Sequence, residues 1–226
     1  MVNVVKSGLI ENVFSYDYVL VGIGTNNSFS GGFAYDIGLN FPSIKIRVNM
    51  MSNYLDRRLM GSVALVTDRN CPSMCVCYVH NGGYRKGKNG EFIDYNALEN
   101  CLRQVSSSFK GKKIASPLIG ASKYDGNGDR ERILDLYKKY FTESDVDVYD
   151  YEQETFDDVM YRALVDLRRR KREKLITYDE YIKEKNLICW KRKNGIFKEM
   201  PEGYACKKGS FSWDDVINVK KKDLEK

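Results

Sequence analysis

The chain has 226 residues, of which 42% are hydrophobic and 30% are charged, and its formal net charge is +6. This length allows one α/β domain of about 150 residues and a remainder. No apolar run approaches the roughly 18 residues of a membrane span, and the first residues lack the apolar core of a signal peptide. We therefore expect a soluble, cytoplasmic protein.

The six cysteines favour reduced thiols, because their positions show no spacing typical of a disulfide framework. Cys75 and Cys77 alternate within an expected strand. A zinc site at Cys71 and Cys75 is disfavoured because a second ligand pair is missing, and the single histidine, His80, is poor material for one. We expect neither a metal nor a cofactor.

The first part of the chain alternates apolar runs with polar turns. Residues 2–5 form the first expected strand, and residues 18–21 form a short, buried, β-branched one. A loop of Gly, Asn and Ser follows, and a helix is expected over residues 35–41, with Pro42 ending it. Residues 45–59 are polar and mixed, and we expect helix or loop there.

Two consecutive strands are expected at residues 61–67 and 74–79, joined by a turn. The following residues, 80–90, read HNGGYRKGKNG and predict a flexible basic loop. Residues 95–109 carry apolar side chains at helical spacing. This stretch predicts a β-β-α succession.

The last part of the first domain shows the same alternation of strands, loops and helices. A strand ends at residues 117–119, an amphipathic helix covers 133–141, and a final strand lies at 147–149. The two helical crossovers are long enough to join parallel strands. The succession β, β, α, β, β, α, β, α, β therefore predicts an α/β domain with a mixed sheet.

We place the domain boundary at residue 152, with a basic α+β extension over residues 153–226. Apolar residues recur at helical spacing over 155–174, and residues 178–185 suggest a second helix. Alternating short runs then predict strands at 187–190, 195–197 and 204–206. Ser212 with the residues after it resembles a helix N-cap.

The extension contains a run of five basic residues: Arg168, Arg169, Arg170, Lys171 and Arg172. As a concentrated positive face, the run would attract the phosphates of a nucleic acid in a salt-dependent way. The alternative is a solvated helix end, whose cations are stabilised by the negative pole of the helix dipole. Nearby glutamates dilute the patch and favour the second interpretation, and both remain open.

The stretch from Asp17 to Phe41 has the chemistry of an anion cradle. Between the strand and the helix, glycines at 24, 31 and 32 let the backbone approach a ligand, and the helix that begins near Phe33 aims its positive end there. The glycine spacing fits neither the GxGxxG dinucleotide fingerprint nor a P-loop. A diphosphate site and a plain tight turn between strand and helix both fit this loop.

A second strand, loop and helix make the pattern more specific. The segments SGGFAYDIGLNFP and SPLIGASKYDGNGDRERILDLYKKYF resemble, in this order, the Gly-Gly-Ile-Ala loop and the Pro-x-Ile-Gly-x-Gly loop of the macro domain, the ADP-ribose-binding fold. The resemblance covers roughly residues 2–150. It implies a three-layer α/β/α domain with a mixed sheet, in which both loops hold ADP-ribose or a derivative at one edge of the sheet.

The resemblance also implies the ligand-binding residues. Those of the first loop and its helix are Gly24, Thr25, Asn27, Ser30, Gly31, Gly32, Phe33 and Ala34. Those of the second loop are Pro117, Ile119, Gly120, Ala121, Ser122, Lys123, Tyr124, Gly126, Asn127 and Gly128. The usual Gly-Asp-Ile after the first strand, whose acid contacts adenine, is replaced here by Gly-Leu-Ile. Glu11 or Asp17 would have to substitute, and a solvated turn residue is the favoured interpretation of both.

Active macro domains hold the distal ribose with an asparagine of the first loop, which is matched here by Asn26 or, one position later, Asn27. A lysine of the branch that includes terminal ADP-ribose glycohydrolases stands roughly where this chain has His80, and the acidic partner on its second loop matches Asp125. Asp129 competes for that role, or caps the helix after it. Asn26, His80 and Asp125 are therefore the candidate catalytic residues.

These residues imply hydrolysis at the distal ribose. The reaction is either dephosphorylation of ADP-ribose-1″-phosphate or removal of ADP-ribosyl or acyl groups. The alternative is a reader, which binds ADP-ribose without turnover and recruits a nucleic acid or a protein through the basic extension. The sequence does not choose among the leaving groups.

Overall fold

The computed structural model describes residues 1–29, 31–52, 55–82, 92–122, 126–150 and 156–204. The chain divides into two compact units, Met1–Gln153 and Glu154–Lys226. The expected flexible basic loop at 80–90 and the N-cap at Ser212 lie largely or wholly outside the described residues. Among the helices of the described residues, none combines the length and the apolar character needed to cross a membrane.

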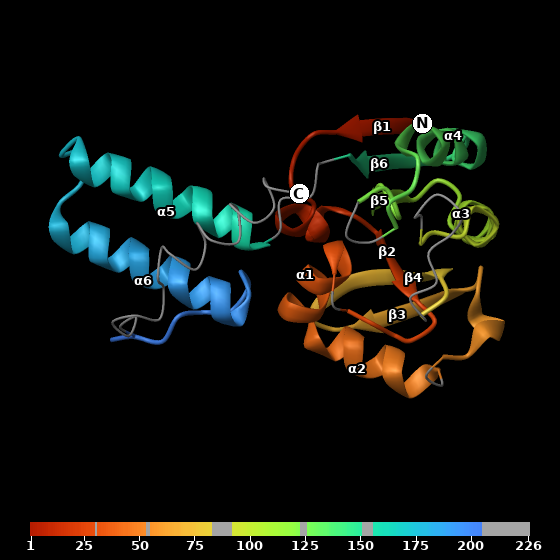
Figure 1. Cartoon of the computed structure of the whole chain (residues 1–226), viewed down its shortest axis with the longest axis horizontal. Coiled ribbons are helices and arrows are strands. Elements are labelled where there is room, and N and C mark those ends of the chain that lie inside the picture. The colour runs from red at the N-terminus through yellow and green to blue at the C-terminus, as the bar shows by residue number, and fades with distance from the viewer. Residues whose placement is uncertain (30, 53–54, 83–91, 123–125, 151–155, 205–226) are drawn as a thin grey trace. The chain divides into compact units, whose positions relative to one another are not determined.

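The first unit is built on a six-stranded mixed sheet (Figure 1). Its strands are β1 (Val2–Val5), β2 (Tyr18–Gly24), β3 (Val63–Asp68), β4 (Cys71–His80), β5 (Lys113–Pro117) and β6 (Asp145–Tyr149). Their spatial order is β1-β6-β5-β2-β4-β3, and every neighbouring pair is parallel except β3 with β4. Five carboxyl ends therefore meet at one edge of the sheet, which we call the carboxyl edge.

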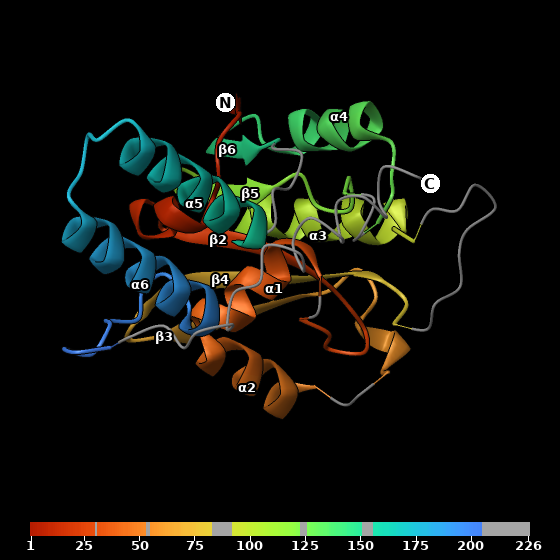
Figure 2. The same cartoon turned by 60° about the vertical axis from the view of Figure 1, so that its left-hand side comes forward.

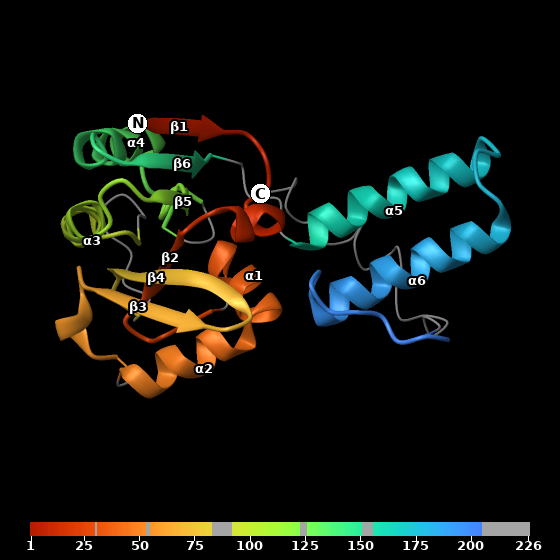
Figure 3. The ribbon, with the colours of Figure 1, turned by 180° about the vertical axis from the view of Figure 1, so that it is seen from behind.

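Helices cover both faces of this sheet. They are α1 (Gly32–Asn40), α2 (Pro42–Met51), α3 (Tyr95–Ser108) and α4 (Arg130–Tyr140), with short 3-10 turns at Ile10–Ser15 and Arg57–Leu59. Helices α1 and α2 contact each other on one face, and α3 and α4 contact each other on the opposite face (Figures 1 and 3). The expected three-layer α/β/α architecture is thereby confirmed.

Burial explains why these segments form these elements. Val19, Leu20 and Val21 of β2 are fully buried in the central part of the sheet, as their continuous apolar run predicts. Helix α3 buries an apolar stripe that includes Leu98 and Leu102, and the Asp94 side chain caps it by accepting from the backbone N–H of Ala97 at 3.0 Å. Helices α3 and α4 thus bury one apolar cluster against their face of the sheet.

Helix α1 begins at Gly32, next to the start expected near Phe33 and before the range 35–41, and Pro42 does more than end it. Pro42 stands in the first turn of α2, where its missing N–H costs nothing because no carbonyl of that helix could receive it. Phe41 separates the two helices with a non-helical backbone and donates its N–H to Ile37 at 2.8 Å. The expected helix or loop at 45–59 is thus mostly α2 followed by a 3-10 turn.

The second unit contains α5 (Phe156–Arg172) and α6 (Tyr178–Asn194), which pack side by side (Figure 2). The strand predicted at 187–190 is wrong, because these residues belong to α6. A Thr177–Glu180 capping box starts α6, and no breaker interrupts it before Gly195, whose φ is 94°. Residues 195–197 form no strand either, and only residue 204 of the predicted strand at 204–206 lies among the described residues.

Candidate functional site

Two loops leave neighbouring strands at the carboxyl edge. The first loop, residues 25–31, joins β2 to α1, and the second loop, residues 118–129, joins β5 to α4. Strand β2 pairs directly with β5 on one side and with β4 on the other, so Gly24 lies opposite His80. The candidate residues of both loops and His80 are therefore brought to the same edge.

Asn26 is held by two backbone contacts. Its side-chain Nδ2 donates to the carbonyl of Gly82 at 3.2 Å, and its Oδ1 accepts from the N–H of Ser28 at 3.3 Å. A carboxamide carries two N–H donors and two acceptor lone pairs, so each end keeps capacity for a further partner. Asn26 is thus fixed in place and still equipped to bind.

The ring of His80 lies beside Asn26 across Gly24. A Cβ atom built on Gly24 would lie 2.6 Å from Nδ1 of His80 and 2.8 Å from Oδ1 of Asn26. These separations are shorter than real Cβ contacts, so the two polar atoms converge on a space that only a glycine leaves open. The structure thereby brings together two of the three candidate catalytic residues.

Thr25 and Asn27, on either side of Asn26, turn inward. Thr25 is 0% exposed and Asn27 is 6% exposed. The Asn27 carboxamide is engaged by Ser52, which donates its hydroxyl to Oδ1 at 3.0 Å and accepts from Nδ2 through its carbonyl at 3.3 Å. Asn27 also takes a left-handed backbone with φ of 54°, as asparagine tolerates. Of the two asparagines, Asn26 is therefore the one that lies beside His80.

The amino end of α1 offers backbone donors at the same edge. Gly31 caps the helix without a side chain, and its carbonyl accepts from Tyr35 at 3.2 Å. The N–H groups of Gly32, Phe33 and Ala34 precede the first intrahelical bond, so the helix itself cannot satisfy them, and they carry its positive pole. This is a suitable place for an anion. Ser30 lies outside the described residues.

The second loop closes on its own backbone. Gly126 and Asn127 donate to the carbonyl of Ser122 at 3.0 and 2.8 Å, and Gly128 donates to the carbonyl of Gly120 at 2.8 Å. A Cβ on Gly126 would lie 2.6 Å from Cα and 2.8 Å from the carbonyl carbon of Gly120. The glycines at 120 and 126 are thus packed backbone to backbone.

The acidic candidates of the second loop separate clearly. Asp129 is the N-cap of α4, because its carboxylate accepts from the N–H of Arg132 at 3.0 Å. Tyr95 supports this cap by accepting the N–H of Asp129 at 2.8 Å through its hydroxyl. The capping interpretation of Asp129 is therefore confirmed. Asp125, with Lys123 and Tyr124, lies outside the described residues.

The two acids considered for an adenine contact, Asp17 and Glu11, lie in different parts of the first unit. Asp17 immediately precedes β2 at the opposite edge of the sheet, where its carboxylate accepts the N–H of Lys113 at 2.9 Å. Glu11 is exposed in the 3-10 turn, and its carboxylate lies over Gly8, because a Cβ there would come within 2.7 Å of Oε2. Asp17 is thus too far along the strand to take part in a site at the carboxyl edge.

Groups of three or more His, Cys, Asp and Glu side chains that could hold a metal ion are absent from the described part of the chain. The thiols of Cys75 and Cys77 in β4 are buried, and burial raises the pKa of Cys75 to about 12. A thiol held neutral is a poor nucleophile and a poor metal ligand. The described chemistry of the site is therefore that of an amide, an imidazole and backbone N–H groups.

Residues of the basic run, among them Arg169, Arg170 and Lys171, are engaged inside the second unit. The ion pairs are Arg169 with Asp166 and Glu173, each at 2.8 Å, and Arg170 with both carboxylate oxygens of Glu184, at 2.8 and 3.0 Å. The Lys171 ammonium lies over the ring of Tyr181, 4.3 Å from its centroid. The contacts of Arg170 and Lys171 join α5 to α6, whereas those of Arg169 stay on α5 and just after it, and together they favour the helix-end interpretation of the run. Nucleic-acid binding stays a prediction.

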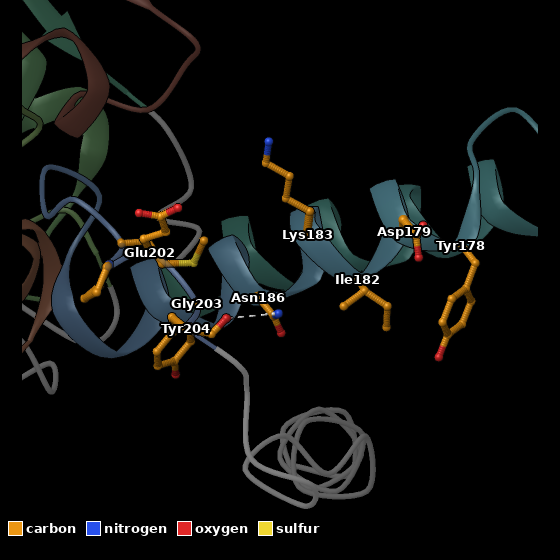
Figure 4. Close-up of a pocket in the computed structure, with 10 residues that line it drawn as sticks. Tyr178, Asp179, Ile182, Lys183, Asn186, Glu202, Gly203 and Tyr204 are labelled. Atoms are coloured by element: carbon orange, nitrogen blue, oxygen red, sulfur yellow. Dashed lines mark hydrogen bonds between the residues drawn. The ribbon is translucent and has the colours of Figure 1, made fainter.

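The second unit also has a pocket of about 600 Å³ beside α6 (Figure 4). Tyr178, Ile182 and Asn186 of α6 line it together with residues 200–204. Asn186 donates its Nδ2 to the carbonyl of Tyr204 at 3.2 Å, and the Tyr204 ring meets Trp190 edge to face at 4.9 Å. These contacts show that the segment after α6 folds back against that helix.

No protein-family model matches the sequence, and no curated protein is similar to it. Solved structures do match. The macrodomain of DarG from Thermus aquaticus aligns with a TM-score of 0.54 at 13% identity, over 66% of this chain and 98% of that one. The Mycobacterium tuberculosis DarG macrodomain aligns with a TM-score of 0.50 at 12% identity, over 66% and 97%.

A third match is DarTG from Thermosipho africanus, solved in complex with ADP-ribose. It aligns with a TM-score of 0.52 at 14% identity, over 68% of this chain and 42% of that protein. The identities are low, so these likenesses speak of the fold. Together with the strand order, the three layers and the two loops, they lead to one conclusion. The first unit of this chain has the macrodomain fold.

Proposed function

We propose that the first unit binds ADP-ribose or a derivative at the carboxyl edge and hydrolyses a bond at its distal ribose. One observation carries the proposal: the Asn26 carboxamide and the His80 ring converge over Gly24, beside the amino end of α1. A diphosphate is a natural ligand for the unsatisfied N–H groups of that helix end. DarTG, which has a similar fold, was solved in complex with ADP-ribose, and this supports the same class of ligand.

The roles follow from the chemistry of the groups. The remaining N–H and lone pair of Asn26 suit the hydroxyls of the distal ribose. His80 accepts a proton from the attacking water, whose oxygen replaces the leaving group at the anomeric carbon, or at phosphorus in ADP-ribose-1″-phosphate. Asp125 is the candidate for returning a proton to the leaving group. This assignment matches either a phosphatase or a hydrolase that removes ADP-ribosyl or acyl groups.

The test begins with binding and turnover by the full chain. Calorimetry with ADP-ribose should give a micromolar dissociation constant, which corresponds to a binding free energy of about −8 kcal/mol. The protein is then incubated with ADP-ribose-1″-phosphate, acetyl-ADP-ribose, ADP-ribosylated protein and ADP-ribosylated nucleic acid, and we expect one class to be cleaved. No heat from ADP-ribose with folded protein would overturn the proposal. Binding without turnover of any substrate would leave a reader.

Variants locate the chemistry. Asn26→Ala and Asp125→Ala should each lower the rate by about 10² or more, the size typical of losing a positioning or acid-base group. His80→Ala should lower the rate by a similar factor, because it removes the group that accepts the proton of the attacking water. Asn49→Ala, an exposed asparagine of α2, is the matched control and should keep full activity. Undiminished turnover in all three site variants would place the chemistry elsewhere.

A further inference from the structure

Thr25 joins three segments that meet at the carboxyl edge. Its N–H donates to the carbonyl of His80 at 3.0 Å, and its carbonyl accepts from the N–H of Leu55 at 2.8 Å. Its hydroxyl Oγ1 accepts from the N–H of Gly82 at 3.1 Å. The residue is 0% exposed, so it reaches no ligand itself. Its position therefore acts on the site only through its neighbours.

Gly82 links Thr25 to Asn26. The N–H of Gly82 is bound by the Thr25 hydroxyl, and its carbonyl accepts from the Asn26 carboxamide at 3.2 Å. A Cβ on Gly82 would lie 2.5 Å from the backbone nitrogen of Asn26 and 2.6 Å from its Cγ, so the two residues are in direct contact. We call the Thr25 hydroxyl, Gly82 and the Asn26 carboxamide the clamp.

The regular pairing of β2 with β4 ends just before this region. Strands β2 and β4 pair regularly up to Ile23 and Tyr78, and then Gly24 pairs with His80, so that Val79 is passed over. Such an irregularity redirects the side chains that follow it. Beyond it, the bonds from Thr25 to His80 and to Gly82 hold the chain after β4 in place. The clamp and the backbone bond from Thr25 to His80 thus hold residues 80 and 82 beside Asn26.

We propose that Thr25 is a positioning residue, whose hydroxyl holds the His80 ring and the Asn26 carboxamide in their relative placement through Gly82. The inference rests on the proposed function, because it assigns Thr25 a part in that reaction. Without the hydroxyl, the N–H of Gly82 loses its acceptor and the segment 80–82 shifts. A misplacement of about 1 Å can lower a rate by up to about 10²-fold.

The first test is kinetic. Thr25→Val removes the acceptor but keeps the branched shape, and it should lower kcat about tenfold or more with little change in KM, because reacting groups are misplaced while binding groups stay. Thr25→Ser restores the hydroxyl and should recover most of the rate. Ser62→Ala, which removes a partly buried hydroxyl bonded to Leu59 at the same edge, is the control and should leave the rate unchanged.

The second test needs no activity. His80 is the only histidine of the chain, so the imidazole signals in a nuclear magnetic resonance spectrum belong to it without assignment. Thr25→Val should shift or broaden these signals, whereas Thr25→Ser and Ser62→Ala should reproduce those of the unmodified protein. Urea unfolding is measured on each variant, and Thr25→Ala takes the place of Thr25→Val if the valine variant does not fold.

The outcomes separate the two proposals. Loss of rate and altered imidazole signals in Thr25→Val, with both restored in Thr25→Ser, support the positioning role. A normal rate with unaltered signals overturns it, and so does an equal change in Ser62→Ala. If the unmodified protein cleaves no substrate, the proposed function fails. The imidazole signals then decide the placement of His80 by Thr25 on their own.

Discussion

The two loops at the carboxyl edge are built in different ways. The first loop is fixed by distant segments, because Thr25 bonds to Leu55, His80 and Gly82. The second loop combines bonds within itself, such as those from Gly126 and Asn127 to Ser122, with bonds that the Gly126 carbonyl accepts from Phe92 and Ile93. The comparison teaches that the second loop needs glycines where backbone lies against backbone, whereas the first loop, held through Thr25, places the polar side chain of Asn26 beside His80.

The largest effect is expected from breaking the second loop at its closest backbone contact. Gly126→Ala would drive a Cβ to 2.6 Å from Cα of Gly120, and backbone cannot yield as a side chain does. We expect a loss of about 3 kcal/mol in the free energy of unfolding, measured in urea, together with weaker ADP-ribose binding. Gly111→Ala, in a turn with open space around it, should cost about 1 kcal/mol from backbone strain alone. Equal losses in the two variants would contradict the packing argument.

The first loop should respond in activity before it responds in stability. Gly24→Ala brings a Cβ against Nδ1 of His80 and Oδ1 of Asn26, which are ends of side chains that rotate away. We therefore expect less than about 1 kcal/mol lost in unfolding free energy but a rate lowered by about 10²-fold. Steady-state kinetics and urea unfolding on the same preparation check both. A variant that unfolds easily while keeping its rate would reverse the contrast between the loops.

The buried thiol of Cys75, in strand β4, gives a reference for an effect on the stability of the whole unit. The folded state keeps the Cys75 thiol neutral, because burial raises its pKa from 9.0 to about 12. The unfolded chain loses that proton near pH 9. The contribution of this thiol to the free energy of unfolding is therefore fully kept below pH 9 and falls by about 1.4 kcal/mol per pH unit above it, up to about pH 12.

The variant that isolates this thiol is Cys75→Ala. It is less stable at pH 8 because it leaves a cavity, and the gap to the unmodified protein should shrink by about 1.4 kcal/mol between pH 9.5 and 10.5. Other buried tyrosines and thiols are present in both proteins, so their contribution cancels. Unfolding in urea at several alkaline pH values measures the gap, and a constant gap would show that Cys75 titrates normally.

The smallest effect is expected where the second loop ends. Asp129→Ala removes the cap of α4 and should cost about 1 kcal/mol of unfolding free energy, while Asp129→Asn keeps an accepting oxygen and should cost less. Turnover should be normal in both variants. A rate lowered by about 10²-fold in Asp129→Asn would assign the acid-base role to Asp129 in place of Asp125.

The strands of the first unit were predictable because their short apolar or alternating runs stand between turn and loop residues. Residues 2–5 match β1, and the strand expected at 147–149 lies within β6. The strand expected at 187–190 failed because four residues of Leu, Ile, Cys and Trp suit a buried helix turn as well as a strand. The capping box at Thr177 and the late breaker Gly195 decided for the helix.

The sequence by itself determined the order of strands and helices and the two glycine loops, because these depend on neighbours in the chain. It left Asp129 open between an acid-base role and the cap of α4. It did not determine which asparagine faces His80. Ser52 draws Asn27 inward and Gly82 holds Asn26, and both partners come from segments 25 or more residues away. It also left Asp17 open, until the parallel pairing of β2 with β5 put that carboxylate at the opposite edge. Tertiary structure decided these points, because side-chain direction at a sheet edge is set by hydrogen bonds between segments that only folding brings together.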